Sequence, residues 1–300
     1  MTEKAQMKIA FIGLGRMGGP IAGHLAAAGH HVTVVEPNLD TLSRWCQNHE
    51  GTSAPSAGAA ASDAEVVITS LPADAQLQAV AEGILDHLPS GGVWVDHTTA
   101  SVQISRTLAR DASTRDLGFI DAPVSGGVDG ATRGTLAIMA GGTTTDIDRV
   151  RPLLQCYAKR ISHMGDAGTG QLTKMTNQIC VVGIGQALAE GLDFAETAGL
   201  DLEKVVGVML RRRTASWQMD NRWQAMANSD YEFGFATELM RKDIGLCLAE
   251  ARRSGVGLPV TALVDQFLSD VEALGGKRWD WCSLMERQRG ARRGESNTGD

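Results

Sequence analysis

The sequence predicts an α/β fold: a Rossmann-like, doubly wound parallel sheet followed by an all-helical C-terminal domain. Three observations support this prediction. Short apolar runs alternate with helical stretches up to about Met164, a glycine-rich turn follows the first run, and the strand signal stops after Gly170. Such alternation is typical of parallel strands joined by crossover helices. The length of 300 residues also favours about two domains.

Six apolar runs are the candidate strands of the sheet. Gly, Pro, Ser or Asp separates nearly all of them, as expected of the loops between strands. In chain order the runs are KIAFIG (8–13), HVTVVE (31–36), EVVITSL (65–71), VWVDHT (93–98), GFIDAP (118–123) and TLAIMAG (135–141). The predicted sheet domain therefore covers residues 1–165.

The remainder of the chain is predicted to be helical. Apolar residues recur at spacings of three and four from Leu172 to Val182, which predicts a helix over about 170–198. At 1.5 Å per residue this helix is roughly 40 Å long, enough to leave one domain and begin the next. We expect a helical domain over 166–290 and a mobile polar tail over 291–300.

Composition favours small-molecule partners. The formal net charge is −7, whereas nucleic acids and anionic membranes favour a basic surface. No run of 18 apolar residues occurs, and residues 1–8 lack the apolar segment of a signal peptide. The five cysteines are scattered without a CxxC pair, which is typical of reduced thiols and not of a metal site. We therefore predict a cytoplasmic protein with no nucleic-acid, membrane or metal partner.

The turn GLGRMGGP (13–20) carries the GxGxxG pattern of a dinucleotide site. The pattern alone is weak, but here an apolar strand precedes it and a helical segment follows. Gly13 permits the tight turn, Gly15 lets backbone approach a pyrophosphate, and Gly18 lets helix and strand pack closely. The helix N-terminus then offers N–H groups to the phosphates. The predicted cofactor-binding residues of this turn are Gly13, Leu14, Gly15, Arg16, Met17 and Gly18.

Glu36 ends the second predicted strand, eighteen residues after Gly18. A carboxylate at this place accepts hydrogen bonds from the adenosine ribose and repels a 2′-phosphate. The predicted cofactor is therefore NAD, in preference to NADP. Arg44, eight residues later, is placed to favour a 2′-phosphate instead.

A second glycine-rich turn, Ser125-Gly126-Gly127, follows the fifth predicted strand, where open α/β sheets place ligands. The Ser125 hydroxyl and the backbone N–H groups of Gly126 and Gly127 are donors that suit a carboxylate. We predict that these residues bind a small carboxylate substrate. A purely structural glycine turn is the alternative.

Four motifs, in order, resemble those of the β-hydroxyacid dehydrogenase family. They are GLGRMGGP (13–20), DAPVSGGVDGATRGTLAIMAGG (121–142), GTGQLTKMTNQ (168–178) and MRKDIGLCLAEA (240–251). The resemblance extends to about Glu286 and implies a homodimer or homotetramer assembled with help from the helical domain. It also implies reversible NAD-dependent oxidation of a short β-hydroxy acid to its semialdehyde, as in 3-hydroxyisobutyrate dehydrogenase.

The resemblance makes Lys174 the general acid/base. A lysine desolvated in a cleft can exchange a proton near the working pH, although an exposed helical lysine would be the simpler interpretation without the motif. Asn177 and Gln178 follow at three and four positions, so both project near the same helix face. Many family members carry Asn where this chain has Gln178. Which amide orients the substrate or the lysine stays open, and we favour Asn177.

The resemblance also assigns residues around the nicotinamide. Asp96, Thr98 and Thr99 resemble the Asp-x-Ser-Thr loop of the family, in which Thr98 and Thr99 bind the cofactor. His97, in the same loop, is a less favoured candidate for the acid/base.

Further residues are expected to bind from neighbouring segments. Leu71 and Pro72 end the third strand and border the adenosine half of the cofactor. Lys242 and Asp243 form the pair that closes over the cofactor and active site in the family, with Lys242 also near the substrate. A solvated helical lysine is the alternative for Lys242.

Arg211, Arg212 and Arg213 stand where many relatives carry small, glycine-rich residues. One interpretation is that a guanidinium faces the pocket and binds a second anionic group of the substrate. The other is a solvated face or a subunit contact.

The same fold also carries other functions. Tartronate semialdehyde reduction uses the same motifs, whereas the helical part is too short for a phosphogluconate-type decarboxylase. Neither Lys174 nor the Ser125 turn favours an imine reductase. A non-catalytic nucleotide-sensing or interaction protein is the alternative of another class, and the presence of Lys174 counts against it.

Overall fold

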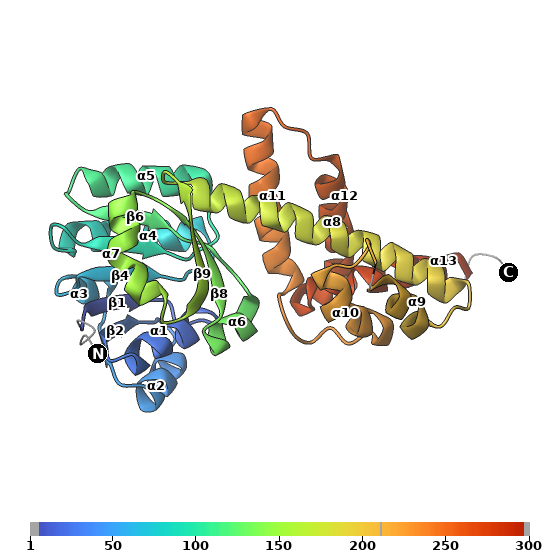
Figure 1. Ribbon diagram of the computed structural model, residues 1–300, viewed down its shortest axis with the longest axis horizontal. Coiled ribbons are helices and arrows are strands. Elements are labelled where there is room, and N and C mark those ends of the chain that lie inside the picture. The colour runs from blue at the N-terminus through green and yellow to red at the C-terminus, as the bar shows by residue number, and fades with distance from the viewer. Residues whose placement is uncertain (1–5, 211, 297–300) are drawn as a thin grey trace. The chain divides into compact units, whose positions relative to one another are not determined.

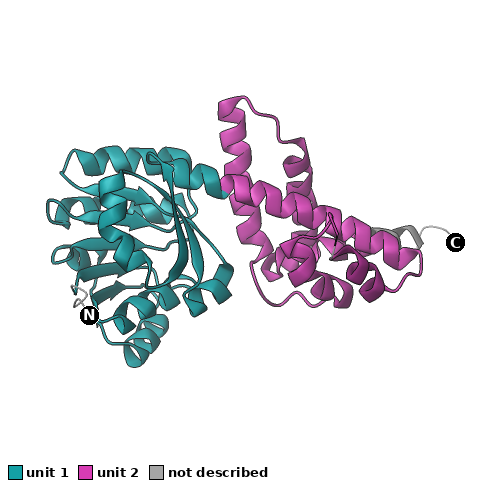
Figure 2. Cartoon of the chain, in the orientation of Figure 1, with its two compact units in different colours: residues 1–174 teal, residues 175–300 magenta. Residues whose placement is uncertain are grey.

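The structure of the chain is a computed structural model that describes residues 6–210 and 212–296. The chain forms two compact units, residues 1–174 and 175–300 (Figure 2). The division falls inside one long helix, α8 (Thr169–Thr197), whereas the sequence suggested a domain boundary near residue 165. Each unit is described separately below.

The first unit is built on one sheet, to which nine strands of the described residues contribute. The strands are β1 (Lys8–Ile12), β2 (His31–Val35), β3 (Thr52–Ser53), β4 (Val66–Thr69), β5 (Val93–Asp96), β6 (Gly118–Asp121), β7 (Val124–Ser125), β8 (Leu136–Gly141) and β9 (Ala158–Gly165). Their order is β3-β2-β1-β4-β5-β6-β8-β7. Strand β9 lies beside β8 (Figure 1). All six predicted strands are present. The order reverses direction between β1 and β4, which is where doubly wound sheets bind ligands.

The expectation of a parallel sheet needs one correction. β1 to β6 pair in parallel, but β8 runs antiparallel to β6 and β7. Only fourteen residues, 122–135, separate β6 from β8. They hold β7 and the short helix α6 (Gly127–Arg133), which leaves little chain for the crossover that a parallel connection requires.

Helices cover both faces of this sheet because strand side chains alternate between the faces. Ile9, Phe11 and Val34 belong to one buried cluster, whereas Ala10, Ile12 and Trp94 belong to a second. The helices against the first cluster include α1 (Gly18–Ala27), α2 (Leu39–Asn48) and α7 (Thr144–Leu154), and those against the second are α3 (Ala57–Ala61), α4 (Asp74–His87) and α5 (Val102–Ser113). The doubly wound architecture is therefore confirmed.

The second unit is helical, as predicted. It contains most of α8, then α9 (Leu202–Met209), α10 (Trp217–Asn228), α11 (Thr237–Ser254), α12 (Pro259–Ala273) and α13 (Leu284–Ser296), with 3₁₀ turns η1 (Gly276–Arg278) and η2 (Trp281–Ser283). Its core is one cluster that includes Leu192, Met226, Ile244 and Leu268. No helix among the described residues combines the length and apolar character of a membrane span.

The polar tail expected over 291–300 overlaps the end of helix α13, which continues to Ser296. Residues 297–300 lie outside the described residues.

Candidate active site

The glycine turn after β1 divides its three glycines between two tasks. Gly13 has φ +96°, and a Cβ there would overlap the Ser70 carbonyl oxygen after β4. A Cβ on Gly18 would overlap the Gly13 carbonyl oxygen. At Gly15, by contrast, a Cβ would meet no protein atom within 4 Å. The fold itself requires Gly13 and Gly18, whereas the open space at Gly15 fits the close approach of a pyrophosphate.

Helix α1 presents a bare N-terminus beside this turn. Its cap residue, Met17, makes no side-chain capping bond, and its first turn holds no acidic residue. The positive end of the helix dipole suits phosphate oxygens, while the Gly19 N–H is bonded to the Gly15 carbonyl at 3.0 Å and Pro20 has no N–H. The turn and the helix start together fit a dinucleotide.

Glu36 contacts the glycine turn directly. Its Oε2 accepts the Leu14 N–H at 2.8 Å, and its Oε1 accepts the Asn38 N–H at 3.0 Å. A carboxylate has about four acceptor positions, so acceptor capacity remains for ribose hydroxyls. Arg44 points to its own helix, where it bonds the Asp40 carbonyl and the Thr41 hydroxyl.

The loops after β4 and β5 are joined by buried polar groups. The Thr98 hydroxyl accepts the Leu71 N–H at 3.1 Å, and the Thr98 N–H donates to Asp96 Oδ1 at 3.0 Å. Thr98 is only 1% exposed, so its side chain holds the Leu71 segment in place. Thr99 is partly buried and Pro72 is exposed. Both were predicted from the sequence to lie at the cofactor.

Asp96 is a fully buried carboxyl. Oδ1 accepts the Thr69 hydroxyl at 2.7 Å, while Oδ2 has no hydrogen-bond partner within the described part of the chain. Burial raises the pKa of Asp96 from 3.8 to about 6, against the lowering effect of its hydrogen bonds.

The raised pKa of Asp96 predicts a pH-dependent stability. The folded chain retains the Asp96 proton at pH values where the unfolded chain has lost it, so stability present below about pH 4 is lost as the pH rises through about 6. We expect the unfolding free energy of Asp96→Asn relative to that of wild type to be about 1.5 kcal/mol higher at about pH 8 than at about pH 5. Urea unfolding at both pH values measures it, with the exposed Asp40→Asn as control. A difference that does not change with pH would contradict the role of Asp96.

His97 makes structural hydrogen bonds, which counts against the alternative that it acts as the acid/base. It is 4% exposed, and its ring bonds the Ala122 carbonyl at 2.6 Å and the Tyr157 hydroxyl at 2.8 Å. Burial lowers the pKa of His97 to about 4, so the ring is neutral at physiological pH. Because a carbonyl only accepts, Nδ1 donates to Ala122 and Nε2 accepts from Tyr157.

Lys174 lies beside the Ser125 turn. Its Nζ donates to the Val124 carbonyl at 3.0 Å, and the residue is 9% exposed. Ser125 is partly buried, and Gly126 and Gly127 are exposed with φ of +126° and +62°. The structure therefore brings together the amine and the turn that the sequence singled out separately.

Two buried residues near Lys174 were missed by sequence reasoning. Asp121 ends β6 and accepts the N–H groups of Gly168 and Gln171 at the start of α8, at 2.6 and 2.8 Å. Burial raises the pKa of Asp121 to about 7, while those two bonds lower it. Asp121 could have been recognised in the sequence as a carboxylate at the end of an apolar strand. No sequence feature outside the motif 168–178 identified Gln171.

In the second unit, a chain of side chains begins on α8. Asn177 donates to Gln178 at 2.9 Å, and Gln178 donates to Asp243 at 2.8 Å. Lys242 forms an ion pair with Asp243 at 2.9 Å. Gln178 and Asp243 are 4% and 2% exposed, so their polar groups serve each other, whereas Asn177 is only partly buried. This favours Asn177 as the amide that meets a ligand.

The arginine segment lies between α9 and α10. Arg212 and Arg213 are exposed in a turn, and Arg211 lies outside the described residues. Exposure is consistent with the solvated face or subunit contact.

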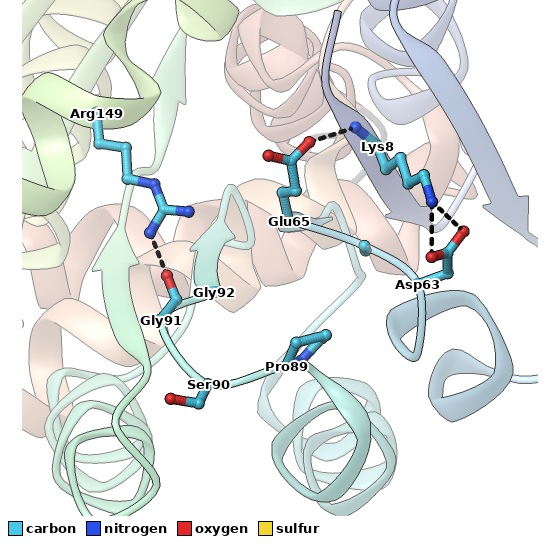
Figure 3. A pocket seen from close by; sticks show the side chains of 9 residues that line it. Lys8, Asp63, Glu65, Pro89, Ser90, Gly91, Gly92 and Arg149 are labelled. Atoms are coloured by element: carbon cyan, nitrogen blue, oxygen red, sulfur yellow. Dashed lines mark hydrogen bonds and ion pairs between the residues drawn. The ribbon is translucent and has the colours of Figure 1, made fainter.

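A surface pocket of about 340 Å³ lies elsewhere on the first unit (Figure 3). Lys8 at the start of β1 and Gly92 just before β5 line it, so it opens at the amino ends of the strands. Lys8 pairs with Asp63 at 2.8 Å, and Arg149 donates to the Gly91 carbonyl. Parallel sheets bind ligands at the carboxyl ends of their strands, so this pocket is not the cofactor site.

Comparison with known proteins gives the family. A model described as the NAD binding domain of 6-phosphogluconate dehydrogenase matches residues 8–165. One described as NAD-binding of NADP-dependent 3-hydroxyisobutyrate dehydrogenase matches residues 168–287. The chain therefore belongs to the β-hydroxyacid dehydrogenase family.

Individual relatives agree with this assignment. An uncharacterized oxidoreductase of Shewanella frigidimarina is 46% identical, over 93% of this chain and 97% of its own. The 3-hydroxyisobutyrate dehydrogenase of Pseudomonas aeruginosa is 35% identical, over 94% and 98%. The structure of Mycobacterium tuberculosis 3-hydroxyisobutyrate dehydrogenase with L-serine matches with a TM-score of 0.88 and 30% identity, over 95% and 100%. The chain is an oxidoreductase with a nicotinamide cofactor.

Proposed function

We propose that this protein catalyses the reversible NAD-dependent oxidation of a short β-hydroxy acid to its semialdehyde. The observation that carries the proposal is the hydrogen bond of 3.0 Å from Lys174 Nζ to the Val124 carbonyl, next to Ser125. It places a buried amine beside a turn suited to a carboxylate. The cofactor, when bound, accepts the hydride from the alcohol carbon or returns it.

Lys174 acts as the general acid/base in this proposal. Oxidation requires a group that takes the hydroxyl proton, and reduction requires one that returns it. The Val124 carbonyl orients the ammonium, and burial limits the water that would compete for it. Asn177, one turn further along α8, is proposed to orient the substrate, and Gln178 to hold Asn177.

The Ser125 turn binds the substrate carboxylate. The Ser125 hydroxyl and the exposed backbone at Gly126 and Gly127 supply neutral hydrogen-bond donors for a carboxylate. Lys242 and Asp243 are proposed to serve the same reaction, as the family motif implies.

A substrate panel tests the proposed function. Reduction of NAD and NADP is followed with 3-hydroxyisobutyrate, 3-hydroxypropionate, glycerate, L-serine, threonate, 4-hydroxybutyrate and sulfolactate. We expect turnover with a short β-hydroxy acid, and no turnover with any of them would overturn the proposal. A preference for glycerate would favour the alternative, tartronate semialdehyde reduction. Efficient turnover of sulfolactate would revive a role for Arg212 or Arg213.

NAD is proposed as the preferred cofactor because Glu36 places a carboxylate beside the glycine turn. We expect Glu36→Ala to shift the ratio of kcat/KM for NADH over NADPH by roughly tenfold towards NADPH, about 1.4 kcal/mol. Asp40→Ala, which removes a neighbouring exposed carboxylate, should leave the ratio unchanged. A wild-type enzyme that prefers NADPH tenfold would remove Glu36 from this role.

We also propose a homodimer or homotetramer. Large apolar side chains of the second unit are exposed, among them Phe194 at 75%, Val208 at 68% and Val260 at 62%. Light scattering after size-exclusion chromatography tests this, and a monomer at micromolar concentration would contradict it.

A further inference from the structure

Two side chains that lie entirely inside the first unit, Asp121 and Gln171, fasten the start of α8 to the sheet. Both are 0% exposed. The Asp121 carboxylate accepts one N–H from Gly168 and one from Gln171, so each of its oxygens anchors the first helical turn. The bonds of 2.6 and 2.8 Å satisfy two of the N–H groups that a helix start leaves unpaired.

The Gln171 side chain adds a second attachment, to the loop after β5. Its Oε1 accepts the Ala100 N–H at 3.1 Å, and its Nε2 donates to the Thr98 carbonyl at 2.7 Å. The loop presents one donor and one acceptor, and a primary amide supplies the complementary pair. A carboxylate would face the Thr98 carbonyl with a second acceptor, and an aliphatic side chain would leave both loop groups without this partner.

Glycines let the helix sit directly on the sheet at this point. A Cβ on Gly170 would overlap the Met139 carbonyl oxygen, and one on Gly141 would lie 2.5 Å from Asp121 Oδ1. The first turn of α8 therefore has backbone contact with β8, which leaves little freedom for its register.

This anchored turn immediately precedes Lys174, which lies three residues after Gln171 and one turn after Gly170. Lys174 in turn bonds Val124, which lies three residues after Asp121. The contacts form a closed path from β6 through α8 to Lys174 and back to the Ser125 turn.

We propose that Gln171 is a positioning residue, which together with Asp121 holds Lys174 at the Ser125 turn and in fixed register with the loop after β5. The inference rests on the proposed role of Lys174. Gln171 is fully buried and does not touch the substrate, so its effect passes through Lys174.

The test compares Gln171→Met with Gln186→Met. Gln186 is also buried on α8, at 5% exposure, but donates to Glu190 in the second unit. We expect Gln171→Met to lower kcat roughly 10- to 100-fold, because small displacements of a catalytic group are costly. KM and the Kd for NADH, measured by fluorescence, should stay within about threefold. Gln186→Met should keep wild-type kcat.

A double variant separates positioning from general stability. If Gln171 acts through Lys174, then adding Gln171→Met to Lys174→Ala lowers kcat no further. If the double variant loses kcat by the same further factor as Gln171→Met does alone, the inference is overturned. It is also overturned if kcat of Gln171→Met lies within about twofold of wild type, or if Gln186→Met loses kcat equally.

Gln171→Glu keeps the inference testable if the methionine variant does not fold. Its kcat relative to wild type should recover as the pH falls, because a protonated carboxyl again donates to Thr98. A ratio that stays constant with pH counts against the inference. Near-wild-type turnover of Lys174→Ala alone would instead overturn the proposed role of Lys174 in the reaction.

Discussion

Lys174→Ala is expected to lower kcat by about 10²- to 10⁴-fold, the range that a positioned acid/base contributes. The loss follows because the variant removes the amine that bonds the Val124 carbonyl beside Ser125. NADH should still bind, since the glycine turn that holds Gly13 to Gly18 is unchanged in this variant. Steady-state kinetics and NADH fluorescence titration measure the two effects separately.

The exposed Lys159 on β9 provides the matched control. Lys159→Ala removes the same charge from the same unit and should leave kcat within about twofold of wild type. Lys174→Met adds a second comparison, because it keeps the side-chain length and loses the proton-transfer group. Turnover of Lys174→Ala within about tenfold of wild type would refute the assignment.

Alanine at the three glycines of the turn should separate fold from cofactor binding. Gly18→Ala drives a methyl group into the Gly13 carbonyl and is expected to cost about 3 kcal/mol or more of unfolding free energy. Gly13→Ala is expected to be similarly destabilising, because it adds a clash with the Ser70 carbonyl to a φ of +96°. Urea unfolding of the chain without cofactor measures both.

Gly15→Ala should behave in the opposite way. Its methyl group meets no protein atom within 4 Å, so the unfolding free energy should stay within about 1 kcal/mol of wild type. The Kd for NADH should rise roughly tenfold or more, because the methyl group occupies space needed by the pyrophosphate. Unchanged NADH affinity would show that Gly15 does not face the cofactor.

The sequence predicted those helices and strands whose formation depends mainly on residues close together in the chain. The apolar run 8–13, the glycines after it and the helical segment that follows depend on neighbours in sequence. Strand β9 (Ala158–Gly165) was missed because half of its residues, AKRISHMG, are polar and much of the strand is exposed. The two-residue strands β3 and β7 are too short to show an alternation.

The site was predictable only in part. Lys174, Ser125 and the glycine turn came from motifs, and the structure brings Lys174 and the Ser125 turn together. The sequence did not indicate that Gln178 bonds Asp243, 65 positions away. Nor did it indicate that His97 bonds Tyr157, 60 positions away. Such pairings depend on which loops meet in space, and no period in the sequence encodes them.

The sequence alone determined six strands of the sheet, the helical character of the second unit, the glycine turn and the family resemblance. Periodicity and backbone freedom are local properties, so they can be read from consecutive residues. Only the tertiary structure decided that His97 is a buried neutral partner of Tyr157, that Asp121 caps α8, and that Gln171 joins this helix to the loop after β5. These roles arise because a buried polar group must find a partner, and the fold determines which one lies within reach.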